Sequence, residues 1–288
     1  WLGGQAGAGA AVDVIFGAVN PSGKLAETFP VRLQDTPAYL NFPGEEGEAF
    51  YGERIYVGYR WFEAREIEPL FPFGHGLSYT SFDYADMSAS ATRFSDSEGL
   101  TVTARITNTG KVAGKEIVQL YVADPVSSLQ RPVKELKGFT KVSLDPGEST
   151  TVRFTLTARD FSFYDSRQSR WVAESGEFEI GLGASSANIR LSETVHLVST
   201  QELNYAFDEY TFFRVLWENE KTKPLLIELM PAWIASHTAD GKSPEEAEIQ
   251  DFLLDQPLIK LPYFTAGEVN REQIMALIEK CNAMTYRP

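Results

Sequence analysis

The sequence predicts a mainly β chain, in which an antiparallel β-sandwich follows a short helix and strand and precedes an α-helical tail. Strand patterns recur between residues 81 and 200, with turn residues about every 8 to 12 positions. A glycine-rich opening leads into an apolar helix, and helix-capping signals with helical periodicity follow residue 201. We therefore divide the chain into residues 1–30, a connector over 31–80, a sandwich over 81–200 and a helical extension over 201–288.

The composition is that of an ordinary globular protein and excludes several other classes. Of 288 residues, 43% are hydrophobic and 23% are charged, which excludes a disordered chain and a collagen-like repeat. The single cysteine, Cys281, excludes a disulfide scaffold and a thiolate metal site. Because 26 basic residues stand against 40 acidic ones, the net charge of −14 argues against nucleic acid or an anionic membrane as a partner.

The opening segment predicts a helix and a strand that cannot form a core by themselves. A helix is expected over Ala10–Phe16, with Gly17 at its C-terminal cap. Turn residues at Asn20–Gly23 lead into a strand over Lys24–Phe29, which Pro30 ends. One helix and one strand bury too little apolar surface to fold alone, so we expect this segment to dock on a partner.

The connector over 31–80 has little periodicity, and we expect an ordered path with short strands. It contains the acidic stretch Pro43–Glu48, the aromatic run Phe50–Phe62 and the loop Phe71–Thr80.

Residues 81–200 alternate apolar and polar side chains in short runs. The runs and turns are Leu100–Ile106, Asn108–Gly110, Ile117–Val122, Phe139–Leu144, Asp145–Gly147, Val152–Leu156, Phe178–Leu182 and Ile189–Leu197. Short strands with such turns are typical of an antiparallel sandwich of the immunoglobulin or fibronectin III kind. The alternation predicts that Phe154 and Phe178 point into its core.

The tail after residue 201 predicts about four helices. Ser243–Glu246 reads as a capping box with proline at its first helical position, and Phe212–Trp217 suggests an earlier helix. Asn270 is a second capping residue, ahead of the apolar face that Ile274, Leu277, Ile278 and Cys281 form. That face must be covered by other tail helices, by the sandwich or by a second subunit. We expect docking within the chain, with a homo-oligomer contact as the alternative.

Several motifs resemble glycoside hydrolase family 3, the β-glucosidase family. Residues 1–30, W-L-G-G-Q-A-G-A-G-A-A-V-D-V-I-F-G-A-V-N-P-S-G-K-L-A-E-T-F-P, resemble the end of its second domain, although Gly3 stands where proline is expected. Phe50–Glu63 and Phe71–Phe82 resemble the linker that follows. Glu116–Pro125, Arg131–Phe139 and Gly176–Gly183 resemble its fibronectin III-like domain. The resemblance extends from Trp1 to about Ser199, and the tail is similar to extensions of some bacterial members.

The resemblance implies an enzyme with three domains: a barrel, then an α/β sandwich domain, then a fibronectin III-like domain. Residues 1–30 would be the last helix and strand of the α/β sandwich domain. A retaining glycosidase needs two carboxyl groups about 5 to 5.5 Å apart across the sugar. In this family a barrel Asp is the nucleophile and a Glu of the second domain is the acid/base. Neither can be assigned here: Ser95-Asp96-Ser97 does not match the nucleophile motif, and the resemblance implies that the acid/base Glu lies upstream of these residues.

The implied function is therefore that of the C-terminal part of a retaining, β-glucosidase-like enzyme, with a structural role and no catalytic residue in this chain. Its partners would be the missing N-terminal catalytic domains and the oligosaccharide or glycoside that they hydrolyse. No metal or organic cofactor is implied. The alternative is a stand-alone, non-catalytic β-sandwich module that binds carbohydrate or protein, which would have no use for residues 1–30. The single cysteine and the absence of a visible leader fit a cytoplasmic, bacterial-type protein.

Candidate functional side chains concentrate in the connector. Glu45, Glu46, Glu48 and Glu53 form its acidic cluster, which favours a solvated loop. The functional alternative is that Tyr51, Glu53 and Arg54 border the substrate cleft of the complete enzyme. Four aromatic residues could stack on sugars, but packing against a neighbouring domain is favoured: these are Tyr56, Tyr59, Trp61 and Phe62. The histidines His75, His196 and His237 lack metal-ligand spacing.

Overall fold

The structure is a computed structural model that describes residues 3–166, 168–201 and 206–285. The chain divides into two compact units, the first ending at Gln201. Each unit has its own hydrophobic core, and we describe the two separately. Trp1, the first residue of the opening motif, lies outside the described residues.

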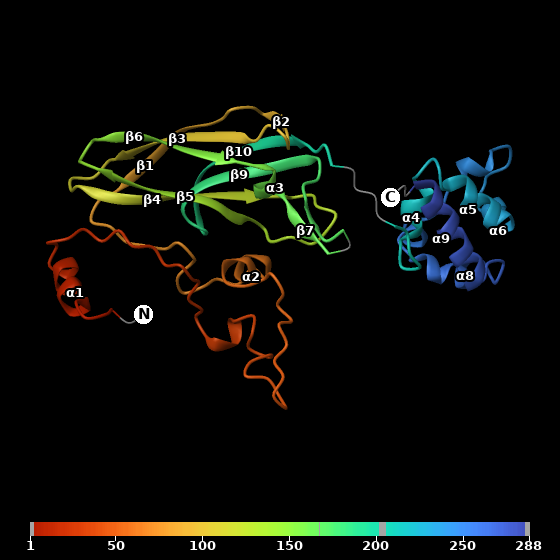
Figure 1. The fold of residues 1–288 in the computed structure, drawn as a ribbon, viewed down its shortest axis with the longest axis horizontal. Helices are drawn as coiled ribbons and strands as arrows, with labels where there is room; N and C mark the ends of the chain where they lie inside the picture. The colour runs from red at the N-terminus through yellow and green to blue at the C-terminus, as the bar shows by residue number, and fades with distance from the viewer. Residues whose placement is uncertain (1–2, 167, 202–205, 286–288) are drawn as a thin grey trace. The chain divides into compact units, whose positions relative to one another are not determined.

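The first unit is built around two antiparallel sheets that stack face to face (Figure 1). One sheet has the strand order β1-β3-β6, and the other has the order β2-β10-β9-β4-β5, in which only the β2–β10 pair is parallel. Their bounds are β1 Phe82–Ala89, β2 Arg93–Ser95, β3 Leu100–Asn108, β4 Gly114–Ala123, β5 Glu135–Leu144, β6 Ser149–Leu156, β9 Gly176–Ser185 and β10 Asn188–Val198. The predicted sandwich is confirmed.

Side-chain alternation places the core between the two sheets. On β3, Leu100, Val102, Ala104 and Ile106 are all buried, as the alternation predicts. From the neighbouring strand of the same sheet, Phe154 of β6 is 8% exposed, and from the opposite sheet, Phe178 of β9 is 1% exposed. Helix α3 Ala158–Phe161 and a hairpin cover one end of the core. The hairpin consists of β7 Phe163–Asp165 and β8 Arg170–Val172. At this end the Phe161 ring packs edge-on against Phe178.

The opening segment forms a helix but only a trace of the expected strand. Helix α1 spans Gly7–Ile15, and none of its residues is buried. Residues 24–29 pair as a strand at a single position, between Phe29 and Phe71, although Leu25 also donates a backbone hydrogen bond to His75. The pairing is irregular because the His75 N–H donates within its own loop, to the Pro72 carbonyl at 3.1 Å, and the Gly74 N–H donates to the Leu25 carbonyl in its place.

The connector contains two short helical elements, η1 Leu33–Asp35 and α2 Tyr59–Ala64. In Figure 1 it runs along one side of the sandwich, with α2 next to the strands. Its acidic stretch turns back on itself, because Glu45 and Glu48 exchange backbone hydrogen bonds.

The second unit is a set of short helices around one core. They are α4 Phe213–Trp217, α5 Lys223–Leu229, α6 Pro231–Ser236, η2 Pro244–Glu246, α7 Asp251–Leu254, η3 Leu258–Lys260, α8 Leu261–Phe264 and α9 Arg271–Thr285. The expected number of about four is wrong, because prolines and turns divide the described tail, residues 206–285, into six α-helices. The Ser243 capping box forms, but it closes a 3-10 turn rather than a long helix.

The predicted apolar face of α9 is confirmed, and its cover is identified. Asn270 and Gln273 exchange backbone-to-side-chain hydrogen bonds of 2.9 Å at the start of the helix. Ile274, Leu277 and Ile278 are buried in a core whose other members also come from the tail. The tail's own helices therefore cover this face.

The sandwich core generates a test of the strand register. Phe178→Ala and Phe154→Ala should each lower the free energy of unfolding by about 3 to 5 kcal/mol, because each removes a buried ring and leaves a cavity. Arg153→Ala, at the exposed position next to Phe154 on β6, should cost well under about 1 kcal/mol. Urea denaturation measures all three, and equal small losses would mean that the register is wrong.

Candidate functional site

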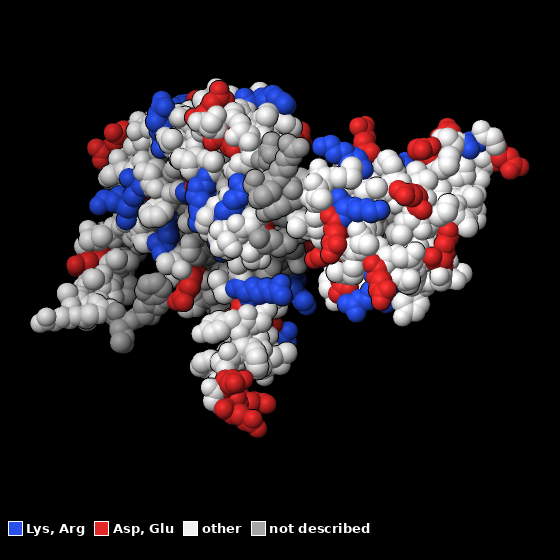
Figure 2. Space-filling model, turned by 45° about the vertical axis from the view of Figure 1, so that its right-hand side comes forward, with Lys and Arg blue, Asp and Glu red and all other residues white. Residues whose placement is uncertain are grey.

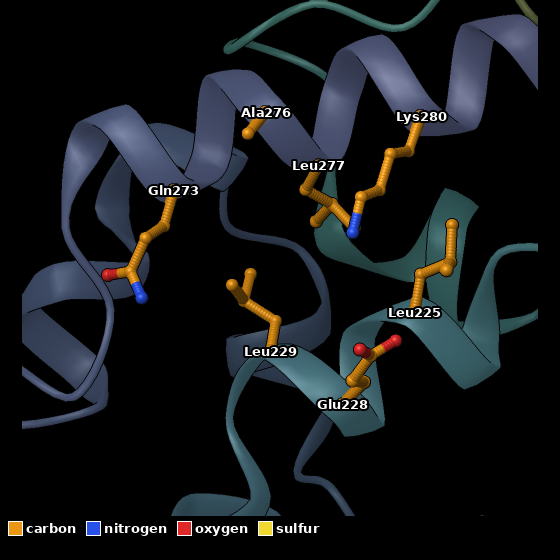
Figure 3. A pocket seen from close by; sticks show the side chains of 7 residues that line it. All are labelled: Leu225, Glu228, Leu229, Gln273, Ala276, Leu277 and Lys280. Atoms are coloured by element: carbon orange, nitrogen blue, oxygen red, sulfur yellow. The ribbon is translucent and has the colours of Figure 1, made fainter.

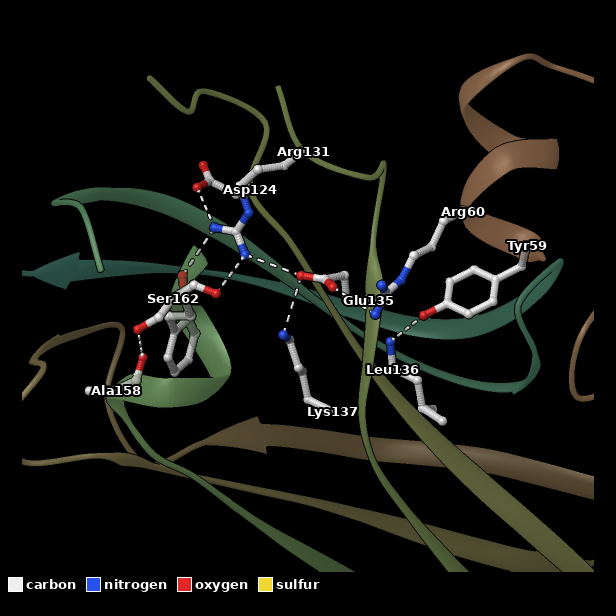
Figure 4. Close-up of polar contacts among 10 residues, drawn as sticks. Tyr59, Arg60, Asp124, Arg131, Glu135, Leu136, Lys137, Ala158 and Ser162 are labelled. Carbon is white, nitrogen blue, oxygen red and sulfur yellow. Dashed lines mark hydrogen bonds and ion pairs between the residues drawn. The ribbon is translucent and has the colours of Figure 1, made fainter. Parts of the chain in front are cut away.

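Helix α2 is held on the start of strand β5 by three polar contacts, and those of Tyr59 and Arg60 are drawn in Figure 4. The backbone N–H of Leu136 donates to the Tyr59 hydroxyl at 2.8 Å. Arg60 forms an ion pair of 2.8 Å with Glu135. About one turn further along α2, Glu63 forms an ion pair of 2.8 Å with Lys134. The Tyr59 ring also packs against the rings of Phe73 and Tyr121.

A second contact fixes the connector near Gly74. The side-chain amide of Gln119 donates to the Gly74 and Ala184 carbonyls at 3.3 and 2.8 Å, and the Tyr121 hydroxyl donates to Gln119 at 2.6 Å. Gly74 has a φ of +80°, and a Cβ there would collide with the Gln119 amide, so this close approach requires glycine.

The opening segment is tied to the start of β4. Lys24 pairs with Glu116 at 2.9 Å. Asn20 donates to the Ala113 carbonyl at 3.0 Å, and its side-chain oxygen accepts from Ser78 and from the Tyr79 N–H. The connector and the residues around position 20 are therefore held on the sandwich by specific contacts.

Buried charges form a cluster around Arg131. This guanidinium donates to Asp124 at 2.8 Å, to the Phe161 carbonyl at 3.0 Å, and to Glu135 and the Ser162 carbonyl at 3.4 Å. The Arg131 and Asp124 side chains are only 6% and 4% exposed. Lys137 adds a third ion pair to Glu135 at 3.3 Å, so one carboxylate is shared by three cations (Figure 4).

The electrostatics of this cluster depend on the balance between burial and pairing. Burial acts to raise the pKa of Glu135, but Lys137, Arg60 and Arg131 outweigh it and hold that pKa below its ordinary value. Burial lowers the pKa of the Lys137 ammonium. For Asp124, burial dominates and raises the pKa of the carboxyl, although Arg131 opposes the shift.

A cavity of about 330 Å³ adjoins the charged cluster. Its walls come from the connector, from the segment that leads into β5, from α3 and from the β7–β8 hairpin. The lining residues are Ile55, Arg60, Leu129, Gln130, Arg131, Pro132, Glu135, Lys137, Arg159, Ser162, Phe163, Tyr164 and Trp171.

The second unit has a groove of about 240 Å³ between α5 and α9 (Figure 3). Leu225, Leu229 and Leu277 point toward one another across it, and Glu228 and Lys280 flank the opening. Its lining contains no histidine, cysteine or hydroxyl group.

The outward surface of residues 7–79 is unusually apolar. The large apolar side chains that are at least half exposed include Val12, Ile15, Phe16, Val19, Val31, Leu33, Leu40, Phe42, Phe50, Tyr51, Val57, Leu70, Leu77 and Tyr79. Acidic side chains gather instead at the tip of the segment that projects from this unit (Figure 2). Glu45, Glu46 and Glu48 are exposed, as expected for a solvated loop.

The predicted cleft residues Tyr51, Glu53 and Arg54 lie on one turn, closed by a hydrogen bond from the Arg54 N–H to the Tyr51 carbonyl. Tyr51 is 83% exposed, and Arg54 is exposed with a φ of +54°. Glu53 is half-buried, and one of its carboxylate oxygens, Oε2, is buried without a hydrogen-bond partner.

Of the aromatic run, Tyr59 packs against the sandwich through Tyr121. Tyr59 and Phe62 are buried, and the Trp61 indole donates to the Asp35 carbonyl at 2.9 Å. Tyr56 is half-buried, with its hydroxyl buried and without a partner.

The histidines and the cysteine have structural surroundings. His75 stacks on Phe71, the His237 ring packs at a tilt against Trp233, and His196 lies within strand β10. Cys281 is buried, and burial raises the pKa of its thiol. Across the described ranges, no group of three or more His, Cys, Asp or Glu residues is placed to hold a metal ion. Nor does any described helix have the length and apolar character needed to cross a membrane.

The Arg131 cluster was not predicted from the sequence, although the motif Arg131–Phe139 was noted there for its resemblance to the fibronectin III-like domain. Its partners Arg60 and Asp124 lie outside that motif, and only the fold brings them to it.

The cluster predicts a defined pH dependence. Since the pKa of Glu135 is lowered from 4.5, its ion pairs stabilise the fold above about pH 4.5, and this stability is lost as the pH falls through the folded-state value. Glu135→Gln should therefore lower the free energy of unfolding by about 2 to 4 kcal/mol at neutral pH. The difference from the unmodified chain should shrink as the pH is lowered below 4.5.

Urea denaturation at several pH values measures this difference. Glu177→Gln, at an exposed position of β9, is the matched control and should change the free energy of unfolding by less than about 0.5 kcal/mol throughout. A loss at Glu135 that is independent of pH would contradict the assignment.

Comparison with known proteins identifies the family. The family model of the glycosyl hydrolase family 3 C-terminal domain matches residues 1–79, and that of the fibronectin type III-like domain matches residues 116–186. Thermostable β-glucosidase B of Acetivibrio thermocellus is 44% identical over 98% of this chain and 37% of its own length. Probable β-glucosidase I of Aspergillus oryzae is 47% identical over 67% of this chain and 24% of its own length.

The crystal structure of a GH3 β-glucosidase from Bifidobacterium adolescentis superposes with a TM-score of 0.70 and 39% identity, over 78% of this chain and 33% of that one. The chain thus spans less than two fifths of the length of each of these relatives. The family models, the sequence relatives and the fold agree: the chain belongs to glycoside hydrolase family 3, of which it carries a C-terminal region that includes the fibronectin type III-like domain.

Proposed function

We propose that the chain is the non-catalytic C-terminal region of a larger β-glucosidase-type enzyme, and that it buttresses the catalytic domains. The complete enzyme would hydrolyse terminal β-linked glucosyl or related residues of oligosaccharides and glycosides with retention. Its nucleophile and its acid/base would lie in the part of the relatives that this chain does not span. The relatives' names as β-glucosidases and the short share of their length that is matched support this proposal.

The observation that carries the proposal is the apolar surface of residues 7–79. Phe16 of the first helical segment is 84% exposed, and Leu40 and Phe42 of the connector are 91% and 76% exposed. Covering each such side chain is worth about 1.5 to 3 kcal/mol, and exposed apolar patches of this kind mark docking sites. The sandwich, in contrast, closes its own core. The catalytic domains of the same enzyme are therefore the proposed partner of this surface.

The contacts of the connector suit a buttress. Tyr59, Arg60 and Gly74 fix the connector on the sandwich, so a domain docked on residues 7–79 would also be held in position relative to the sandwich. In this proposal residues 1–30 complete the α/β domain, 31–80 connect it to the sandwich over 81–200, and 201–288 are an appended helical domain.

The turn at Tyr51, Glu53 and Arg54 is proposed as part of the rim of the substrate cleft. The unpartnered oxygen of Glu53 is costly as long as nothing donates to it. A donor from the catalytic domains or a sugar hydroxyl would satisfy it. The left-handed conformation of Arg54 is the kind of local strain found at ligand-binding turns.

Activity measurements test the proposal. The purified chain should not hydrolyse an aryl β-glucoside above background, because a retaining mechanism needs both carboxylates. A chimera in which this chain replaces the matching region of the Acetivibrio enzyme should hydrolyse it, since the two regions are 44% identical. In that chimera Phe16→Asp should destabilise the enzyme by about 3 kcal/mol through an unpaired buried carboxylate.

Thr155→Asp is the matched control, because Thr155 is exposed on β6, an edge strand that tolerates charge. The chimera carrying it should keep its melting temperature and its activity. Turnover by the isolated chain that disappears when one of its own carboxylates is replaced would refute the proposal.

A further inference from the structure

The turn that precedes helix α2 contains buried oxygens that nothing in the described chain satisfies. One carboxylate oxygen of Glu53, Oε2, and the hydroxyl of Tyr56 are buried without a hydrogen-bond partner. The Thr28 hydroxyl is a third such atom, and it lies 3.8 Å from the position that a Cβ on Gly58 would take. Native structures pair nearly all of their buried polar atoms. Three unpaired oxygens in adjoining segments therefore indicate that a partner is missing there.

The turn itself is fixed in place. The Glu53 carbonyl accepts from the Tyr56 N–H at 2.9 Å, and Gly58, with a φ of +55°, leads directly into α2. Helix α2 is in turn bonded to β5 through Tyr59 and Arg60. The Glu53 side chain is therefore attached to a preorganised backbone, which lowers the entropy cost of a specific contact.

The cations that hold α2 are already paired with other carboxylates. Arg60 pairs with Glu135 at 2.8 Å, and Lys134 pairs with Glu63 at 2.8 Å. Nothing in the described part of the chain donates to Oε2 of Glu53. A donor for this oxygen has to come from outside the described residues or from a rearrangement of the turn.

The surroundings of Glu53 decide which kind of partner fits. Tyr51, Ile55 and Val57 are 83%, 49% and 50% exposed, so apolar side chains flank Glu53 on both sides along the chain. A domain that covers them would also remove the Glu53 carboxylate from water. A carboxylate taken out of water needs a cationic partner, because a neutral donor leaves its charge unbalanced. We propose that a lysine or arginine side chain of the catalytic domains of the same enzyme pairs with Glu53.

The length of the relatives supports this choice of partner. The match to thermostable β-glucosidase B covers 37% of that enzyme, so most of such an enzyme lies outside this chain. The identity of the docked domain rests on the proposed function, whereas the need for a cation rests on the charge and burial of Glu53. Apolar contacts are not directional, so the ion pair would set the register in which the apolar surface of residues 7–79 docks.

Melting curves of the isolated chain and of the active chimera test the proposal. Glu53→Gln should lower the melting temperature of the chimera by at least about 4 °C, because it leaves a buried cation unpaired. Glu53→Lys should lower it further, because two cations then face each other. In the isolated chain, which lacks the partner, both variants should melt within about 2 °C of the unmodified protein. Glu177→Gln, at an exposed position of β9, is the matched control and should change neither protein.

Four results would overturn the proposal. The first is a chimera whose melting temperature does not change with Glu53→Gln. The second is an equal loss for Glu53→Gln and Glu53→Lys, which would show that the partner is not a cation. The third is the same loss in the isolated chain and for Arg54→Gln, which would show pairing within the turn. The fourth is a raised KM for an aryl β-glucoside at an unchanged melting temperature, which would show that a sugar hydroxyl is the partner.

Failure of this proposal is distinct from failure of the proposed function. Phe16→Asp tests the docking of the apolar surface without involving Glu53. If Glu53→Gln has no effect while Phe16→Asp still destabilises the chimera, the buttressing role stands and only the ion pair is wrong.

Discussion

The Glu135 carboxylate is the point on which the arrangement of the first unit depends. It accepts from Arg60 of α2, from Arg131 and from Lys137, and so joins the connector to the first residue of β5. Arg131 extends the same network to Asp124 and to the carbonyls of Phe161 and Ser162. Without this carboxylate three cations would lie close together with one acceptor fewer between them, and α2 would lose its ion pair with β5.

That attachment explains how one unit can have both a closed core and an open surface. The sandwich buries its apolar side chains between two sheets, whereas the residues before it leave theirs exposed. Helix α1 is the extreme case, since none of its residues is buried. A segment that is fixed in place and yet apolar on its outside is suited to holding another domain. This combination connects the ion pairs of the sandwich to the role proposed for the whole chain.

The sequence predicts those parts of the fold that local periodicity determines. The alternation along β3 and β9 and the capping of α9 by Asn270 are all present in the structure. Predictions failed where distant residues decide the outcome. The His75 N–H is bonded within its own loop and so limits the pairing of residues 24–29, and the charged cluster depends on Arg60 lying 75 positions before Glu135. The unpartnered oxygen of Glu53 gives no sequence signal, because its neighbours in space set its burial.

The most direct test of the central claim is the solvent exposure of Val12, Phe16, Leu40 and Phe42 inside a complete enzyme. Carbene footprinting of the isolated chain and of the active chimera compares their exposure in the two states. The account predicts strong labelling of these side chains in the isolated chain and protection of at least several-fold in the chimera, with Thr155 labelled equally in both. Equal labelling of the four apolar residues in an active chimera would contradict the claim that this surface docks on the catalytic domains.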